Sequence, residues 1–240
     1  LFTEMSDCIS RKDNEGFKKH LNLGLRTTWL LIVPMAVLLF VCSDELIGLY
    51  TAGKFTASDI RPVADLLCGW AVALPLFAGY MFLYRAYSSI KDLKTIAICN
   101  LFLTVIQITV YMVLTGVISI PGMPTIGLVG IACGDITFYL LMIVVLLLIM
   151  RKRVGNFHFS KLAISTAKVI VASIVGGIVA ELVSWLVESF VDITNIFGSL
   201  VTLVIVGAVG LAVIIIACRI LHVDEISSIL SRLTSKLRRQ

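Results

Sequence analysis

Long apolar stretches separated by short polar segments dominate this chain. Each stretch is uncharged or nearly so, and each exceeds the roughly 20 residues that a helix needs to cross about 30 Å of hydrocarbon. Little sequence is left over for a soluble domain. The pattern therefore predicts an all-α integral membrane protein with about six transmembrane helices, near residues 22–48, 62–84, 95–120, 125–150, 162–187 and 196–221.

Composition and charge placement agree with this fold class. Hydrophobic residues make up 59% of the chain and charged residues 15%, far from the balance of a soluble domain. Most of the 20 Lys and Arg residues precede the first span, follow the last, or lie in the connections at 85–94 and 151–161. Because cytoplasmic loops collect Lys and Arg, both chain ends are predicted to be cytoplasmic. The net charge of +5 then suits anionic lipid headgroups rather than nucleic acid.

A few polar side chains inside the spans are candidates for a functional site. Gln107 and Tyr111 are four residues apart and share one helix face, where they either form interhelical hydrogen bonds or line a polar cavity. Asp135 lies about one third of the way into its span, where an ionised carboxylate is costly unless it is paired or faces water. It either faces a cavity or accepts an interhelical hydrogen bond. Just before it, the spacing of Gly130 and Gly134 permits close helix approach.

Glycines, which have no side chain, lie near the middle of each of the last two spans. Gly176 and Gly177 lie in one span, and Gly207 and Gly210 lie in the other. These faces either pack the two helices tightly together or leave a groove between them. The basic segment "LHVDEISSILSRLTSKLRRQ" that follows is amphipathic and is expected to lie on the cytoplasmic membrane surface.

The connection "AGKFTASDI", residues 52–60, combines features of a membrane anchor and a helix start. Lys54 and Phe55 suit the level of the lipid headgroups, and Thr56 with Asp59 has the spacing of a capping box. In the preceding span, Pro34 removes a backbone donor and predicts a kink.

Residue types that carry catalysis or bind metals are scattered along the sequence. The six cysteines occur singly, without a C-x-x-C pair, and the three histidines lie near predicted cytoplasmic edges. The sequence contains no Walker-type phosphate loop and no H-E-x-x-H or G-x-S-x-G motif. We therefore predict no enzyme activity, no cofactor and no metal site.

Several stretches carry a likeness to a known family. They are "LFTEMSDCISRKDNEGFKKHLNLGLR", "AGKFTASDI", "YRAYSSIKDLKTIAICN", "GLVGIACGD" and "LHVDEISSIL". "GKFTASD" is similar to a G-x-F-T-x-x-D segment and "YSSIKDLKT" to an aromatic-rich D-x-K-T-P turn. With these segments the chain resembles the MurJ/MviN family of lipid II flippases, within the multidrug/oligosaccharidyl-lipid/polysaccharide exporter superfamily.

The chain also departs from the family pattern. Ile96 stands where the family usually has proline, so the kink at that helix start is not expected. Gln107, Tyr111 and Ala132 occupy positions where some members place polar ligands for a cation. The resemblance therefore implies no sodium site.

The resemblance implies the C-terminal half of a fourteen-helix transporter built from two bundles. Residues 1–21 would end a preceding helix and form a cytoplasmic elbow, and 22–150 would supply four helices of the C-terminal bundle. Residues 151–221 would form the last two helices and a possible groove for a lipid tail, and 222–240 the cytoplasmic tail. The arginines that hold the lipid pyrophosphate would lie in the missing N-terminal half.

The implied function is flipping of a lipid-linked peptidoglycan precursor across the bacterial inner (plasma) membrane by alternating access, in cell-wall biogenesis and cell shape. The implied partners are a polyprenyl-pyrophosphate-linked sugar lipid, membrane lipids and the N-terminal half of the same protein. Alternatives are a flippase for another polyprenyl-linked oligosaccharide, a cation-coupled drug exporter of the same superfamily, or a non-transporting membrane scaffold. The expected substrate path comprises Asp135, Gln107, Tyr111, Gly176, Gly177, Gly207 and Gly210.

Overall fold

The computed structural model describes residues 2–50, 57–118, 121, 125–155, 159–189 and 196–221, and these form helices joined by short connections. The helices are α1 (Phe2–Ser10), α2 (Asn14–Val41), α3 (Ser43–Gly48), α4 (Ala57–Ser89), α5 (Leu93–Leu114), α6 (Val129–Val154), α7 (Phe159–Glu188) and α8 (Ile196–Ile220). Six of the described helices, all except α1 and α3, are long and apolar enough to cross a membrane. The predicted all-α class with six spans is therefore confirmed. The predicted membrane anchor, capping box and C-terminal tail fall outside the described residues and side chains.

The first span differs most from the bounds that the apolar pattern predicts. Directly before α2, the side chain of Asp13 accepts a hydrogen bond from the backbone N–H of Gly16 at 2.9 Å and caps the helix. The helix therefore already includes the charged segment that precedes the apolar run. It ends at Val41, and residues 43–48, which the pattern assigns to the same span, form the separate helix α3. Pro34 lies inside α2, and the kink there stays a prediction.

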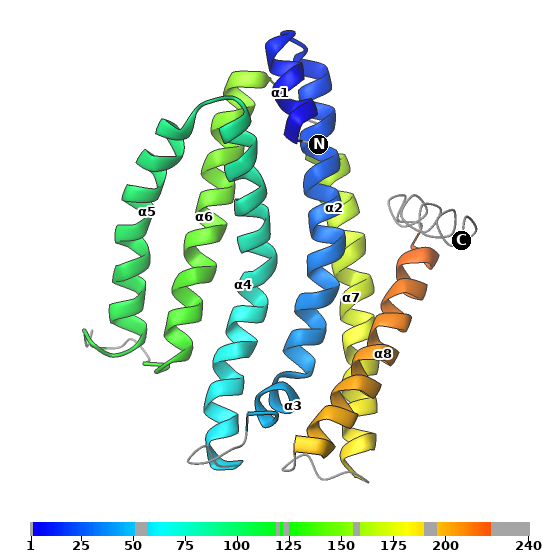
Figure 1. Cartoon of the computed structure of the whole chain (residues 1–240). Coiled ribbons are helices and arrows are strands. Elements are labelled where there is room, and N and C mark those ends of the chain that lie inside the picture. Colours follow the sequence, from blue (N-terminus) through cyan, green and yellow to red (C-terminus); the bar gives the residue numbers. More distant parts are fainter. Residues whose placement is uncertain are drawn as a thin grey trace.

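The six long helices stand side by side in a row. Figure 1 shows the order α5, α6, α4, α2, α7, α8, and each helix packs chiefly on its neighbours in that order. The short helix α3 packs on α4 and α8 at one end of the helices, and α1 packs on α2 and α4 at the other. A row leaves broad faces uncovered, and on α5 the side chains of Leu101 and Phe102 are 69% and 67% exposed. Such apolar faces require lipid or further protein to cover them.

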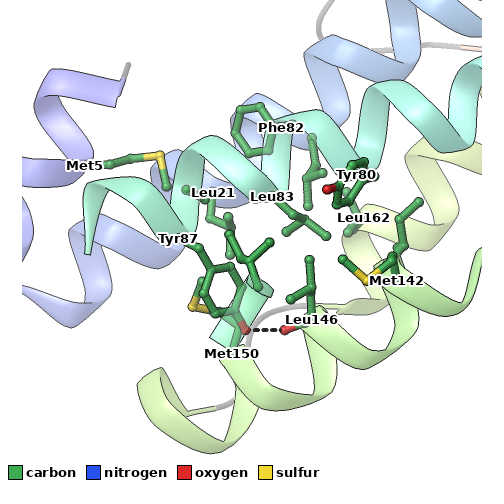
Figure 2. Packing of buried hydrophobic residues seen from close by; sticks show 14 of the residues in the cluster. Met5, Leu21, Tyr80, Phe82, Leu83, Tyr87, Met142, Leu146, Met150 and Leu162 are labelled. Carbon is green, nitrogen blue, oxygen red and sulfur yellow. Dashed lines mark hydrogen bonds between the residues drawn. The ribbon is translucent and has the colours of Figure 1, made fainter. Parts of the chain in front are cut away.

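The middle of the row is joined by an apolar core in which α1, α2, α4 and α6 meet (Figure 2). Tyr87 is fully buried there, and its hydroxyl donates to the carbonyl of Leu146 at 2.7 Å. The indole N–H of Trp29 donates to the carbonyl of Pro75 at 3.0 Å and so ties α2 to α4. The ring of Tyr87 is fully buried and that of Trp29 partly buried, and each side chain satisfies its single polar group. The core thus fixes α2, α4 and α6 relative to one another.

The turn between α4 and α5 is held by the segment that resembles the D-x-K-T-P pattern. Asp92 caps α5 by accepting a hydrogen bond from the backbone N–H of Thr95 at 3.4 Å. Its other carboxylate oxygen pairs with Arg153 at 2.6 Å, and Arg153 also donates to the Thr95 hydroxyl at 3.1 Å. This one carboxylate therefore starts α5 and binds it to the end of α6. Ile96 is buried in the core one residue further on.

Candidate functional site

The closest gathering of polar side chains within the described spans lies where α4, α5 and α6 meet. Asp135 is the seventh residue of α6, about 9 Å along the axis from its first residue. Gln107 lies seven residues before the end of α5, about 10 Å from that end. Because the chain reverses between α5 and α6, the two residues reach the same depth.

The network centres on the carboxylate of Asp135. The amide Nε2 of Gln107 donates to Oδ1 at 2.8 Å and also to the Tyr111 hydroxyl at 2.7 Å. The Tyr111 hydroxyl in turn donates to the same Oδ1. From α4, the indole Nε1–H of Trp70 donates to Oδ2 at 3.0 Å. Three donors from two other helices thus converge on one acidic group.

Glycine spacing makes this convergence possible. A Cβ at Gly134 would overlap the ring of Tyr111, and a Cβ at Gly130 would lie 2.9 Å from the backbone carbon of Leu114. The absence of both side chains lets α5 approach α6 closely enough for Tyr111 to reach Asp135. The close helix approach that the Gly130 and Gly134 spacing predicts is therefore present.

Both side-chain oxygens of Asp135 act as hydrogen-bond acceptors. A carboxylate accepts hydrogen bonds at both oxygens and has four acceptor positions, of which the network fills three. Donors aimed at the charge offset part of the cost of placing it within a span. The unfilled position is on Oδ2, beside Trp70, which is 45% exposed. The site can therefore hold α4, α5 and α6 together and still accept one further hydrogen bond.

Sequence reasoning did not single out Trp70. A tryptophan in an apolar run resembles a membrane-interface anchor, and nothing local indicates its partner on another helix. One signal could have found it. An indole N–H that lies away from the membrane interface needs a hydrogen-bond acceptor, and Asp135 is one of the few side-chain acceptors within the spans.

Of the predicted site residues, the structure brings Asp135, Gln107 and Tyr111 together. Their place in a substrate path stays a prediction.

The four glycines of the last two spans lie in different surroundings. Gly176 and Gly210 meet in the contact between α7 and α8, where a Cβ at Gly210 would lie 2.5 Å from Leu38 Cδ2 and 3.0 Å from Ala180 Cβ. Gly177 faces α2 instead. Gly207 has nothing within 4 Å of an added Cβ and so borders open space. The structure therefore does not gather the four positions into one surface.

An apolar groove, which we call the α2–α7 groove, lies beside Gly177 and has a volume of ≈ 610 Å³. Its walls come from α2, α4 and α7, with Val37, Pro75 and Ile178 among the lining residues. Glu181 is the acidic residue at its edge. The groove can accommodate a hydrocarbon chain, because almost its whole wall is aliphatic.

A buried acid lies at the end of the row that contains α3. Glu45 is 1% exposed, and its Oε1 accepts a hydrogen bond from the Ser184 hydroxyl of α7 at 2.6 Å. Cys42, in the connection between α2 and α3, is 3% exposed. Burial, followed by the nearby carboxylates of Glu45 and Glu181, raises the pKa of the Cys42 thiol to about 12. The thiol is therefore a packing group with little nucleophilic character.

These features define the class of the molecule as a multi-pass α-helical membrane protein with a polar network inside the helix row. Comparison with known proteins gives the family. The model of the family described as "Lipid II flippase MurJ" matches residues 1–201, and the chain belongs to this family.

Several curated relatives carry the same name. A probable lipid II flippase MurJ of Thermotoga maritima is 26% identical over 222 residues, which cover 92% of this chain and 41% of that protein. One of Borreliella burgdorferi is 24% identical over 154 residues, covering 64% of this chain and 29% of the relative. Lipid II flippase MurJ of Thermosipho africanus is 32% identical over 84 residues, covering 35% and 18%. The chain thus spans less than half the length of each of these relatives. No solved structure is a significant match to the chain.

Proposed function

We propose that the protein containing this chain moves a lipid-linked peptidoglycan precursor across the bacterial plasma membrane by alternating access, and that residues 1–240 form one wall of the transport path. The observation that carries the proposal is the family match over residues 1–201. The row of helices with uncovered apolar faces supports it, because alternating access requires one helix bundle to rock against another around the substrate. Such movement requires no covalent step, which agrees with the predicted lack of enzyme activity.

Within this function, the network around Asp135 keeps α4, α5 and α6 moving as one body. Two interhelical hydrogen bonds resist sliding of α5 against α6, and a third at the same depth joins α4 to α6. The open acceptor position on Oδ2 is suited to a hydroxyl or amide donor of the sugar-peptide headgroup. The substrate path proposed here therefore includes Asp135, Gln107 and Tyr111.

The polyprenyl tail is proposed to travel beside α7. The α2–α7 groove supplies an aliphatic surface next to Gly177. The surrounding lipid is as apolar as the groove, so moving the polyprenyl tail from lipid into the groove contributes little binding free energy. Its contribution is to guide the tail while the headgroup crosses.

Reconstitution of the natural protein, with any sequence that flanks residues 1–240, tests the proposal directly. Liposomes containing a fluorescent lipid-linked precursor are expected to show its transfer between leaflets, and the Asp135→Leu variant is expected to be impaired. A polyprenyl-linked oligosaccharide without the peptide is the comparison substrate. Equal transfer of both lipids would point to a broader flippase, and transfer of neither would contradict the proposed function.

A further inference from the structure

The short helix α3 is bonded to α4 through its first two residues. Ser43 Oγ lies 3.1 Å from Cys68 Sγ of α4, in a hydrogen bond that either atom can donate. Asp44 accepts a hydrogen bond from the guanidinium of Arg61, also of α4, at 3.0 Å. Positions 61 and 68 lie about two helical turns apart, or about 10 Å along the axis. The two bonds therefore fix where α3 lies along α4.

The third residue of α3 is bonded to α7 instead. Glu45 Oε1 accepts a hydrogen bond from the hydroxyl of Ser184 at 2.6 Å, and both side chains are buried. A carboxylate that loses its hydrogen-bond donors inside a protein or in lipid is costly. Glu45 therefore favours the one position of α7 in which Ser184 reaches it.

The α2–α7 groove separates α4 from α7 along the middle of these helices. Ala71 belongs to its α4 wall and Glu181 to its α7 wall. Cys68 precedes Ala71 by three residues and Ser184 follows Glu181 by three, which is about one helical turn in each case. Because α4 begins and α7 ends at the end of the row that contains α3 (Figure 1), both steps lead toward that end. The bonds of α3 thus lie just beyond the groove, one on each wall.

Two elements join the walls of the groove in the described part of the chain. The helix α2 packs on both α4 and α7 and lines the groove between them. The helix α3 packs on α4 and on α8, and Glu45 bonds it to α7. The separation of the walls at this end of the groove therefore depends on α3.

We propose that Glu45 is a positioning residue that sets the separation of the two walls of the α2–α7 groove. It holds α7 through Ser184, while Ser43 and Asp44 hold the same short helix on α4. When α4 moves, α3 carries α7 with it, so the groove keeps its width. The inference rests on the proposed function for what the groove carries. The separation itself is measured without transport, so a failure of the proposed function leaves this test standing.

Distances between spin labels on the two walls test the proposal in the natural protein, with any sequence that flanks residues 1–240. Val63→Cys on α4 and Leu186→Cys on α7 supply the label positions. Their native side chains are 36% and 55% exposed, and neither lines the groove. The native cysteines are replaced, with Cys68→Ser retaining a group that can bond to Ser43. Double electron–electron resonance in lipid nanodiscs then gives the reference distance distribution.

Removing the bond between Glu45 and Ser184 should release α7 from α3. Glu45→Leu and Ser184→Ala are each expected to broaden the distribution toward longer distances. Ser184→Ala deletes a single hydroxyl group, so it keeps the test valid if Glu45→Leu folds poorly. Because both changes remove the same bond, the double variant should be no broader than Glu45→Leu alone.

Asp65→Leu is the matched control, since it also replaces an acid with leucine near this end of the row. Asp65 pairs with Arg61 of its own helix at 3.2 Å, and its loss leaves the pair of Arg61 with Asp44 in place. The control is expected to keep the reference distribution. Equal broadening in the control would show general loosening and overturn the proposal. Unchanged distances in Glu45→Leu and Ser184→Ala, even with a lower melting temperature, would overturn it as well, and so would additive broadening in the double variant.

Discussion

Asp135 is held by side chains that belong to two different helices. Gln107 and Tyr111 approach it from α5 and Trp70 from α4. An interhelical hydrogen bond in a membrane protein contributes on average about 0.6 kcal/mol and at most about 1.7 kcal/mol. The network is therefore worth a few kcal/mol at most. Its larger effect is geometric, because it fixes the relative height of three helices.

Two replacements of Asp135 separate its hydrogen bonding from its packing. Asp135→Asn retains one acceptor oxygen and is expected to lower the free energy of unfolding by less than about 1 kcal/mol. Asp135→Leu leaves three donors without an acceptor and should cost about 1–3 kcal/mol. Thermal unfolding in detergent and precursor transfer in liposomes measure the two effects. Wild-type transfer by both variants would remove Asp135 from the substrate path.

Trp70→Phe tests the one member of the network that the sequence did not predict. The change removes the indole N–H that donates to Asp135 at 3.0 Å but keeps an aromatic ring. We expect a loss of about 0.6 kcal/mol of stability and reduced transfer. Trp185→Phe is the matched control, since Trp185 is 71% exposed on α7. Identical behaviour of the two variants would mean that the Trp70 hydrogen bond has no energetic role.

Cys42 gives a prediction about chemical reactivity. With its pKa raised to about 12, mainly by burial, the thiol stays protonated across the usual labelling range, and only the thiolate reacts. In a variant that retains Cys42 alone, alkylation of the folded protein should be slow and should still rise about tenfold per pH unit between about pH 8 and pH 10. A rate that levels off near pH 9, as for an ordinary thiol, would contradict the buried placement. Labelling after unfolding is the control for reagent quality.

At the scale of the helices, two glycines of α8 make a matched pair. Gly210 contacts Leu38 and Ala180, whereas Gly207 borders open space. Gly210→Leu is therefore expected to force α8 away from α2 and α7 and to cost about 1–3 kcal/mol of stability. Gly207→Leu should change stability by no more than about 0.5 kcal/mol. Melting temperatures in detergent compare the two, and equal losses would show that α8 packs through a different face.

The positions of the long helices were predictable because each is an apolar run too long for an ordinary buried strand. Their order in the row was not predictable, since a helix that is apolar all round gives no sign of which face meets a neighbour. The break at Cys42 was missed although the sequence marks it. Residues 43–48 begin with Ser43, Asp44 and Glu45, and they form a separate helix, α3, that packs on α4 and α8.

The candidate site was predictable in its parts. The spacing of Gln107 and Tyr111 placed them on one face, and the cost of a carboxylate within a span singled out Asp135. Their meeting depends on the pairing of α5 with α6 through Gly134, which only the tertiary structure provides. Trp70 belongs to α4, a different element again. The four glycines had identical local signals but lie in different environments.

At the scale of the whole molecule, charge is distributed unevenly between the two ends of the row. The described bases Arg11, Lys12, Lys91 and Arg151 lie near the end where α1 packs and where α4 turns into α5 (Figure 1). At the opposite end, Arg61 pairs with Asp44 at 3.0 Å and with Asp65 at 3.2 Å. Its positive charge is thus compensated locally. The asymmetry supports a cytoplasmic location for the end that carries the basic connections.

This orientation can be tested with single cysteines in a background without the native ones. Ser88, near the end of α4, and Thr125, before α6, are both exposed and lie at opposite ends of the row. A membrane-impermeant maleimide added to intact spheroplasts should label Thr125→Cys and leave Ser88→Cys unlabelled until the membrane is opened. The physical reason is that basic connections are retained on the cytoplasmic side during insertion, whereas the connection before α6 carries no basic residue between residues 115 and 128. Because α4, α5 and α6 are successive spans, one inverted result reverses the orientation of every helix in the row. Labelling of Ser88→Cys alone from outside would therefore place both basic connections on the outer surface and would overturn the assignment of the cytoplasmic face.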